Sequence, residues 1–329
     1  GVNRSGAKAP AVHLGDQVLG SEGAQMEDPA VTLVRGDYFE RLNIDPERAA
    51  AIVKAGPNVT DLRYLLHQHV LNVPFGNLAL HEMPGEDVPA IPRWHLKPTL
   101  EVHTSLRKLI YHRREGFCWE INFCFAWLLR SLGYHVRLAV ANVITPGGPI
   151  PGHLVLFVDD LDPSGAILVD PGFGDHVREL VVMPTGTATC GMIGDLYKIE
   201  TVHAYGERFN SSLMRARQSR VNPILEIMEM EHGSPEHAPF EPLYIFNTND
   251  DLDWHSDDFA MGLAAVLTDV PENLFMQKRF VLLPTTSGYH FMGRNYYKRI
   301  SKGLEVERKS NLSEAEWRAL LAEKIGVVL

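Results

Sequence analysis

Hydrophobic residues recur at helical spacing through the first quarter of the chain, over residues 37–81. One helix is expected to follow Thr60, its predicted N-cap, and to gather on one face Leu62, Leu65, Leu66 and His69. Pro74 ends this helix, and prolines scattered over residues 83–99 predict a loop. Another helix is expected over residues 100–112.

A strongly apolar stretch over residues 117–132 predicts a buried helix that stops at Gly133, a favoured residue just beyond a helix end. Alternating apolar and polar residues then predict three strands, with a tight Gly/Pro loop over 145–152 between the first two. These strands are expected at 135–144, 153–158 and 166–170.

The rest of the chain mixes strand signals with two helices. Strands are expected at 196–202, 225–230, 280–284 and 289–292, with a link between domains at 233–240. A helix is expected over 257–267, and Ser313 with Glu316 has the spacing of a capping box that opens a C-terminal helix. Helices followed by a run of strands favour an α+β fold over an alternating sheet.

Composition narrows the class of protein. The 329 residues are enough for two or three packed units, and 45% hydrophobic and 22% charged residues are ordinary for a globular protein. The formal net charge of −10 argues against broad nucleic-acid binding, which needs clustered Lys and Arg. No apolar run reaches the roughly 18 to 20 residues that span a bilayer. We therefore expect neither a nucleic-acid partner nor a membrane.

The cysteine content and the N-terminal segment indicate the cellular compartment in which the protein is expected. Three cysteines are too few for a disulfide framework, which fits a reducing compartment and predicts a cytoplasmic protein. No basic segment followed by an apolar one marks a secretory signal. Residues 1–25, rich in Gly, Ala and polar side chains and followed by Met26, are expected to be a tag or a disordered tail.

The segment around Cys118 carries the most specific chemistry. Gly116 permits an abrupt turn into the apolar helix, which would place the Cys118 thiol at a helix N-terminus, where the macrodipole favours a thiolate. The backbone N–H of Cys118 would then help to bind the oxygen of an attacked carbonyl. A single cysteine is more often a small buried hydrophobic residue. The position of Cys118 between a glycine turn and a helix favours a reactive thiol and a buried structural cysteine equally.

A thiolate nucleophile needs a base to take its proton and an anion to orient that base. His153 is expected to open one strand and Asp170 to close the next, so adjacent antiparallel strands would bring the two together at one end of a sheet. Taken singly, each is more typical of an ordinary residue, a histidine of a surface loop or an aspartate that forms a turn.

These residues occur in motifs that resemble the arylamine N-acetyltransferase family, whose hallmark is Arg-Gly-Gly-aromatic-Cys-x-Glu-x-Asn. The hallmark is matched by Arg114, Gly116, Phe117, Cys118, Glu120 and Asn122. The family's Gly-His-Leu strand start and Val-Asp-x-Gly-Phe-Gly turn follow at residues 152–154 and 169–174, and its Pro-Phe-Glu-Asn-Leu element is matched at 74–78. Several ordered motifs make the resemblance specific over residues 36–175.

The resemblance implies an N-terminal helical bundle over 26–134, a central antiparallel β-barrel-like domain over 135–238 and a C-terminal α/β lid over 239–329. The implied activity is ping-pong acyl transfer, in which Cys118 takes an acyl group from acetyl-CoA or malonyl-CoA. The acceptor would be an arylamine, a hydrazine or an N-hydroxyarylamine, as in xenobiotic detoxification. Neither a metal nor a prosthetic group is implied, and the oligomeric state is left open.

Two further sets of residues are expected around the triad of Cys118, His153 and Asp170. Structural support of the site is assigned to Arg114, Glu120 and Asn122. Substrate contact is assigned to Phe117, Gly152, Gly172 and Phe173. Arg114 would pair with a carboxylate and hold the cysteine turn, while a flat aromatic face at Phe173 suits an arylamine ring. The two glycines would let a ligand approach the backbone closely.

The sequence departs from the family pattern at four positions. These are Gly76, Glu115, Pro171 and Asn273. None removes a triad member, so the class of chemistry is kept, and the departures bear on local turn geometry and on the acyl donor. Most relatives use acetyl-CoA, whereas some, especially fungal-type members, prefer malonyl-CoA, whose carboxylate needs a polar partner.

Three other interpretations compete. A thiol hydrolase or a transglutaminase also uses Cys, His and Asp, and the acceptor distinguishes them from an acyltransferase. A metal site would use His67 and His69 with His153 as a third ligand. It would require the rings of His67 and His69 on one side, although two residues at this spacing point about 200° apart on a helix. A non-catalytic binding module would carry a vestigial triad.

Overall fold

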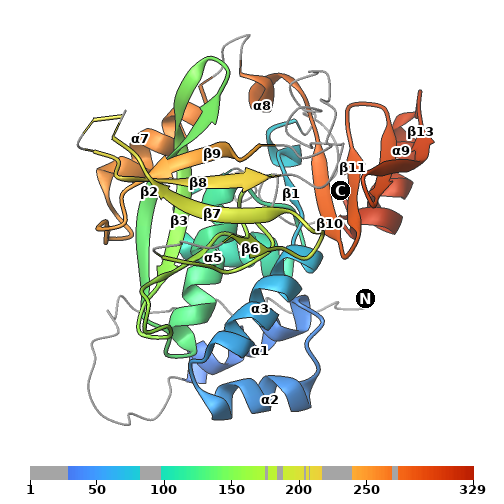
Figure 1. Ribbon diagram of the computed structural model, residues 1–329. Helices are drawn as coiled ribbons and strands as arrows, with labels where there is room; N and C mark the ends of the chain where they lie inside the picture. Colours follow the sequence, from blue (N-terminus) through green and yellow to red (C-terminus); the bar gives the residue numbers. More distant parts are fainter. Residues whose placement is uncertain are drawn as a thin grey trace.

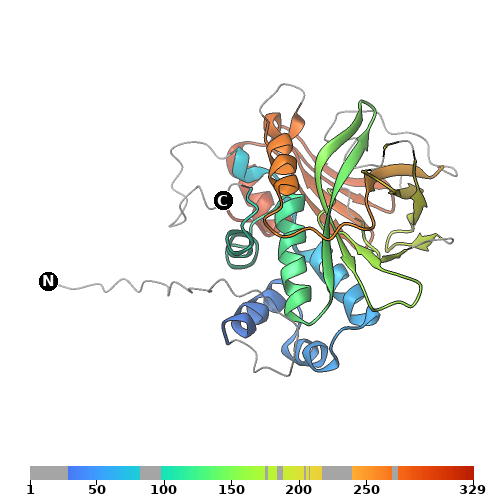
Figure 2. The same cartoon turned by 90° about the vertical axis from the view of Figure 1, so that its left-hand side faces the viewer.

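The computed structural model describes residues 29–81, 98–174, 177–183, 188–203, 205–206, 208–216, 239–268 and 273–329. The tail expected over 1–25 and the strand expected over 225–230 lie outside these residues, as do most of the loop over 83–99 and of the link over 233–240. The described part consists of N-terminal helices, an eight-stranded sheet and a five-stranded sheet (Figures 1 and 2). All three contribute side chains to one large hydrophobic core.

Three helices open the described chain: α1 (Pro29–Arg41), α2 (Pro46–Ala55) and α3 (Val59–Asn72). The face predicted for α3 is buried as expected. Its N-cap, however, is Asn58 and not Thr60, because the Asn58 side chain accepts a hydrogen bond from the backbone N–H of Asp61 at 2.8 Å. Asparagine is a stronger cap than threonine, so the helix begins before Thr60.

The nucleophile helix follows after two short 3₁₀ and α segments. These are η1 (Leu78–Leu80) and α4 (Val102–Leu106), the latter continued by a π-helical turn, η3 (Arg107–Tyr111). The apolar stretch forms α5 (Cys118–Ser131), whose side chains are nearly all buried, and Gly133 at φ 87° ends it as predicted. None of the described helices is long and apolar enough to cross a bilayer.

The larger sheet is antiparallel and contains β2 (Val136–Thr145), β3 (Gly148–Val158), β4 (Ile167–Val169), β5 (Val181–Val182), β6 (Thr189–Cys190), β7 (Leu196–Thr201), β8 (Ser211–Ala216) and β9 (Glu241–Phe246). Its strand order is β5-β4-β3-β2-β9-β8-β7-β6. Edge strand β5 also contacts β7, so the sheet curls nearly into a barrel. The predicted α+β, barrel-like fold class is confirmed.

The smaller sheet has the order β1-β10-β11-β12-β13 and is antiparallel throughout. Its strands are β1 (Phe75–Gly76), β10 (Val281–Thr285), β11 (Gly288–Met292), β12 (Tyr297–Ser301) and β13 (Leu304–Lys309). The helical segments of this region are α8 (Leu274–Gln277), α9 (Glu314–Leu320) and η4 (Leu321–Ile325). The capping box predicted at Ser313 is present.

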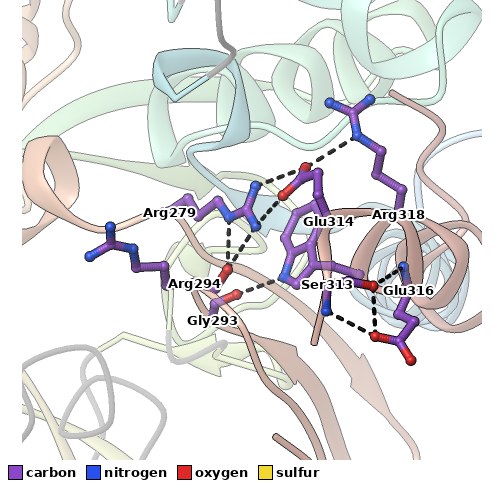
Figure 3. Close-up of polar contacts among 8 residues, drawn as sticks. Arg279, Gly293, Arg294, Ser313, Glu314, Glu316 and Arg318 are labelled. Carbon is purple, nitrogen blue, oxygen red and sulfur yellow. Dashed lines mark hydrogen bonds and ion pairs between the residues drawn. The ribbon is translucent and has the colours of Figure 1, made fainter. Parts of the chain in front are cut away.

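Polar contacts around Glu314 fix the C-terminal helix to the smaller sheet (Figure 3). The Glu314 carboxylate pairs with Arg279 at 2.7 Å, and the same guanidinium donates to the Arg294 carbonyl oxygen at 2.7 Å. Arg279 also lies 4.0 Å from the ring centroid of Trp317, which is fully buried and donates its indole N–H to the Gly293 carbonyl oxygen. The pair is thus desolvated on one side by an aromatic ring.

Helix α7 (Asp257–Val266) follows β9 in the chain and packs against β3 and β2 of the larger sheet. Two strands cross the domain borders expected from the sequence. β9 belongs to the eight-stranded sheet although it lies in the range expected for the lid, and β1 pairs with β10 although it lies in the helical range. The exact borders of the three domains stay a prediction.

The tight loop expected over 145–152 is wrong, because β3 begins at Gly148 and His153 lies inside this strand. His153 pairs with Ala141 and Pro151 with Asn142, so Gly152 is a β-bulge. Residues 149–151 are exposed in a hairpin that projects beyond the rest of the sheet (Figure 1). Pro149 and Pro151 are tolerated there because, among the described residues, β4 pairs only with residues 156–158 of β3 and leaves this part of the strand as an edge.

Replacing Asn58 by Ala removes the cap of α3 and should lower the free energy of unfolding by about 1 kcal/mol. Thr60→Ala is the matched control, since the Thr60 side chain is exposed and caps nothing. Urea denaturation of both variants measures the difference; an equal loss in the two would contradict the assignment of Asn58.

Candidate active site

Cys118 is the first residue of α5, and the chain turns just before it. The N-cap residue Phe117 is extended, with φ −81° and ψ 170°, and its N–H donates to the Glu120 carboxylate at 3.0 Å. Gly116 forms a parallel bridge with Phe75 of β1. The thiol therefore lies at a helix N-terminus, where backbone N–H groups have no partner within the helix.

Gly116 serves this turn through close packing, since its φ lies outside the left-handed region that favours glycine. A Cβ at this position would lie 3.1 Å from side-chain atoms of both Leu109 and Ile121. The segment passes tightly between α5 and the η3 turn, so a side chain at this position would have to push Leu109 or Ile121 aside. The predicted abrupt turn is present, and its physical basis differs from the expected backbone freedom.

Two buried ion pairs flank the turn. The Lys108 ammonium lies 2.9 and 3.0 Å from the two carboxylate oxygens of Glu120, with side chains 1% and 0% exposed. Arg114 pairs with Glu115 at 3.1 Å, and Glu115 also accepts the N–H of Ala79. Burial raises the pKa of the Glu120 carboxyl, and Lys108 opposes that rise. These contacts place Arg114 and Glu120 where structural support was expected.

His153 connects the thiol to a carboxylate. Its Nε2 lies 2.7 Å from Asp170 Oδ2, with side chains 2% and 0% exposed, and this leaves Nδ1 for its hydrogen bond with Cys118. The Cys118 Sγ also lies 3.5 Å from the Gly152 carbonyl oxygen. The antiparallel pairing of β3 with β4 brings the two strands together as expected.

Asp170 is held by groups on two other elements. Asn122, one turn along α5 from the cysteine, donates to Asp170 Oδ1 at 2.8 Å and accepts the N–H of Gly172 at 2.9 Å. The phenol of Tyr244 on β9 lies beside the same carboxylate, and burial together with the Asp170 charge raises the pKa of Tyr244. Asn122 therefore ties the nucleophile helix to the Asp170 turn.

The electrostatics favour a charged imidazole. Burial alone would lower the pKa of His153, but Asp170 and Cys118 raise it to about 10. His153 therefore carries a proton throughout the neutral range. Because this pKa lies above the ordinary value of 6.5, the stabilisation is fully present below pH 6.5 and is lost as the pH rises through about 10.

The four residues expected to contact substrate are packed against other residues of the chain, in part against the triad itself. Phe173 packs edge-to-face on His153, with ring centroids 5.3 Å apart, and Phe117 packs on Phe275 at 5.7 Å. A Cβ at Gly172 would lie 2.7 Å from the Cys118 carbonyl oxygen, and the corresponding space at Gly152 is filled by α7. Both glycines thus have a packing role, and substrate contact at these positions stays a prediction.

The histidines of the metal interpretation have separate partners. His69 is buried and shares a 2.7 Å hydrogen bond with the Tyr38 hydroxyl, whereas His67 lies 3.1 Å from the Arg178 carbonyl oxygen. Within the described ranges, no group of three or more His, Cys, Asp or Glu side chains is arranged to hold a metal ion.

Comparison with known proteins decides among the remaining interpretations. A family model described as N-acetyltransferase matches residues 58–329, which is most of the chain. This chain belongs to the arylamine N-acetyltransferase family. It is therefore an acyltransferase by family, and the resemblance read from its motifs is confirmed.

Curated relatives within the family are distant. The arylamine N-acetyltransferase liver isozyme of Gallus gallus is 22% identical over 304 residues, which cover 89% of this chain and 95% of that protein. The arylamine N-acetyltransferase of Mycobacterium bovis is 32% identical over 142 residues, covering 42% of this chain and 44% of the relative.

Solved structures of the family share the fold. The arylamine N-acetyltransferase from Salmonella typhimurium superposes with a TM-score of 0.66 at 22% identity, covering 89% of this chain and 91% of that one. The Mycobacterium marinum arylamine N-acetyltransferase in complex with CoA gives a TM-score of 0.66 at 20% identity, covering 89% and 92%.

Two side chains around the site were not predicted from the sequence: Lys108, the partner of Glu120, and Tyr244, which lies beside Asp170. Lys108 lies ten residues before the cysteine with nothing in the local pattern to mark it, and Tyr244 lies in a short strand whose long-range pairing no local pattern reveals. Arg114 was expected to pair with a carboxylate, and this carboxylate is Glu115, a position at which the sequence departs from the family pattern.

Lys108→Met should leave Glu120 buried without its counter-charge and lower the free energy of unfolding by about 3–5 kcal/mol. Adding Glu120→Gln removes that charge and should restore most of the loss while keeping an acceptor for the Phe117 N–H. Denaturation of the single and double variants tests the coupling. Purely additive losses would show that the pair does not act as a unit.

Proposed function

We propose that this protein transfers an acetyl group from acetyl-CoA to an arylamine through an acyl-cysteine at Cys118, by a ping-pong mechanism. The proposal rests on one observation above all. The Cys118 thiol, at a helix N-terminus, is linked through His153 to a buried Asp170, which accepts a further hydrogen bond from Asn122 and lies beside the phenol of Tyr244. These three linked side chains supply a nucleophile, a proton shuttle and an orienting anion.

In the first half-reaction, the Cys118 thiolate attacks the thioester carbonyl and forms a new C–S bond. The backbone N–H of Cys118, together with the other free N–H groups at the start of α5, would bind the developing oxyanion. The C–S bond to CoA then breaks, and the CoA thiolate takes the proton from His153. The acetyl group is left on Cys118.

In the second half-reaction, the amine nitrogen attacks the acetyl-cysteine carbonyl. His153, now neutral, accepts the proton that the amine loses, and the Cys118 thiolate is expelled as the amide forms. Asp170 holds the ring in the required tautomer and stabilises the imidazolium that is regenerated. The enzyme thus returns to its starting charge state without any metal or prosthetic group.

The acceptor we propose is an arylamine, a hydrazine or an N-hydroxyarylamine. The aromatic rings of Phe173 and Phe117, one against His153 and the other directly before Cys118, support a flat aromatic acceptor. A Salmonella typhimurium relative carries the double name arylamine N-acetyltransferase / N-hydroxyarylamine O-acetyltransferase, which supports the third acceptor class. We place the reaction in the cytoplasm, in the detoxification of xenobiotics.

Malonyl-CoA is the second candidate donor. Of the departures from the family pattern, Glu115 lies in the ion pair beside the cysteine turn, and Asn273 donates to the Val266 and Thr268 carbonyl oxygens at the end of α7, at 2.7 Å each. Both changes therefore affect the frame around the site. Neither supplies a cation for a malonyl carboxylate, so acetyl-CoA is the preferred donor.

Mixing the protein with acetyl-CoA, without acceptor, should give a mass increase of one acetyl group on the Cys118 peptide and release of one CoA. Malonyl-CoA, mixed with the protein in a parallel experiment, should add a malonyl group more slowly or not at all. Adding an arylamine should then remove the label and yield the acetylated amine. Cys118→Ser is the control that should not form the thioester.

Faster or exclusive labelling by malonyl-CoA would replace the proposed donor and keep the mechanism. Transfer that requires donor and amine together, with no labelled intermediate on rapid quenching, would contradict the ping-pong scheme. Loss of the acyl group to water at the same rate with and without amine would instead indicate a hydrolase.

A further inference from the structure

Helix α7 packs directly on the two chain segments that carry the nucleophile and its histidine. One residue of this helix, Gly262, reaches both. A Cβ at Gly262 would lie 2.5 Å from Trp119 Cζ2 and 3.2 Å from Gly152 Cα. Trp119 follows Cys118 in the chain, and Gly152 precedes His153. The helix backbone at Gly262 therefore fits between the neighbours of both catalytic residues.

The contact with β3 is reciprocal. A Cβ at Gly152 would lie 2.9 Å from the Gly262 carbonyl oxygen and 2.6 Å from Val266 Cγ2. Gly152 also has φ 124°, in the region that side-chain-bearing residues avoid, and its carbonyl oxygen lies 3.5 Å from the Cys118 Sγ. Two glycines thus meet back to back, and one of them, Gly152, is the β-bulge directly before His153.

The contact with α5 is aromatic. Phe259, one turn before Gly262 and fully buried, packs edge-to-face on Trp119 with ring centroids 5.6 Å apart. It also packs on Phe123 at 5.5 Å. At its other end, α7 is held by Asn273, which donates to the Val266 carbonyl oxygen at 2.7 Å. The helix is fixed at both ends, so it cannot slide away from a larger residue without breaking these contacts.

Glycine is a poor residue for the middle of a helix, and alanine is the best. Its presence at Gly262 is explained by the closeness of the neighbouring chains. We propose that Gly262 is a positioning residue, which sets the spacing between Cys118 and His153 by letting α7 pack against Trp119 and Gly152 at once. This proposal rests on the proposed function, because it gives those two residues their catalytic roles.

A methyl group at position 262 must displace either Trp119 or the Gly152 bulge. Either movement changes the distance between the thiol and the imidazole, although neither catalytic side chain is altered. A misplacement of about 1 Å in an active site can cost on the order of 100-fold in rate. Gly262→Ala should therefore impair the step in which Cys118 is acylated, while alanine favours the helix itself.

The test compares Gly262→Ala with Ala264→Gly, a change on the exposed face of the same helix. The probe is p-nitrophenyl acetate, an activated ester that acylates a thiolate without CoA. Burst kinetics give the acylation rate of Cys118 from pH 5 to 10. Thermal unfolding of each variant shows how far stability has changed.

For Gly262→Ala we expect an acylation rate lowered by about 10- to 100-fold near neutral pH, an altered pH profile, and little loss of thermal stability. Ala264→Gly should lower thermal stability and leave the acylation rate and pH profile at the wild-type values. Trp119→Phe removes the ring atoms nearest to position 262, so Trp119→Phe/Gly262→Ala should acylate faster than Gly262→Ala alone.

An acylation rate and pH profile of Gly262→Ala equal to those of the wild type would overturn the proposal. Equal effects of Gly262→Ala and Ala264→Gly on rate would overturn it as well, since the effect would then follow from helix stability. Absence of acylation in the wild-type protein would refute the proposed function itself, and is thus distinguished from failure of the positioning role.

Discussion

The hydrogen bond between His153 and Asp170 is the interaction on which the site depends. A carboxylate with no exposed surface is strongly disfavoured unless other groups compensate for the lost water. Here the compensation comes from hydrogen bonds with His153 on β3 and Asn122 on α5, and the phenol of Tyr244 on β9 lies beside the same carboxylate. Because these groups belong to different parts of the fold, the buried charge constrains the helix and both strands to one arrangement, which also places Cys118 beside the imidazole.

Buried charges are also compensated one layer farther from the reacting atoms. Beside the cysteine turn, the pairs Lys108–Glu120 and Arg114–Glu115 keep four charged groups buried and paired. Buried pairs add little net stability compared with apolar residues of similar volume, yet losing one partner is costly. Their effect is therefore to allow few alternative conformations for the turn. Glu120 also accepts the Phe117 N–H, so the pair directly sets where α5 begins.

Local patterns in the sequence were sufficient for the nucleophile helix, for the adjacency of the strands carrying His153 and Asp170, and for the family. They failed where the outcome depends on contacts distant in the chain. The Gly/Pro stretch before His153 looked like a loop, but it is a projecting part of a hairpin in which proline is tolerated. Likewise, Gly116 was expected to permit an abrupt turn through backbone freedom, whereas close packing against Leu109 and Ile121 accounts for the glycine. No local signal marks such neighbours.

The central claim is that Asp170 keeps the His153 imidazole protonated beside the Cys118 thiol at neutral pH. Its most direct test is the titration of the His153 imidazole, followed by NMR in the wild type and in Asp170→Asn. An imidazole without such a partner titrates near pH 6.5. We predict that the wild-type imidazole keeps its proton up to a pH of about 10, and that Asp170→Asn loses it at a lower pH. Identical titrations near pH 6.5 in the two proteins would contradict the claim.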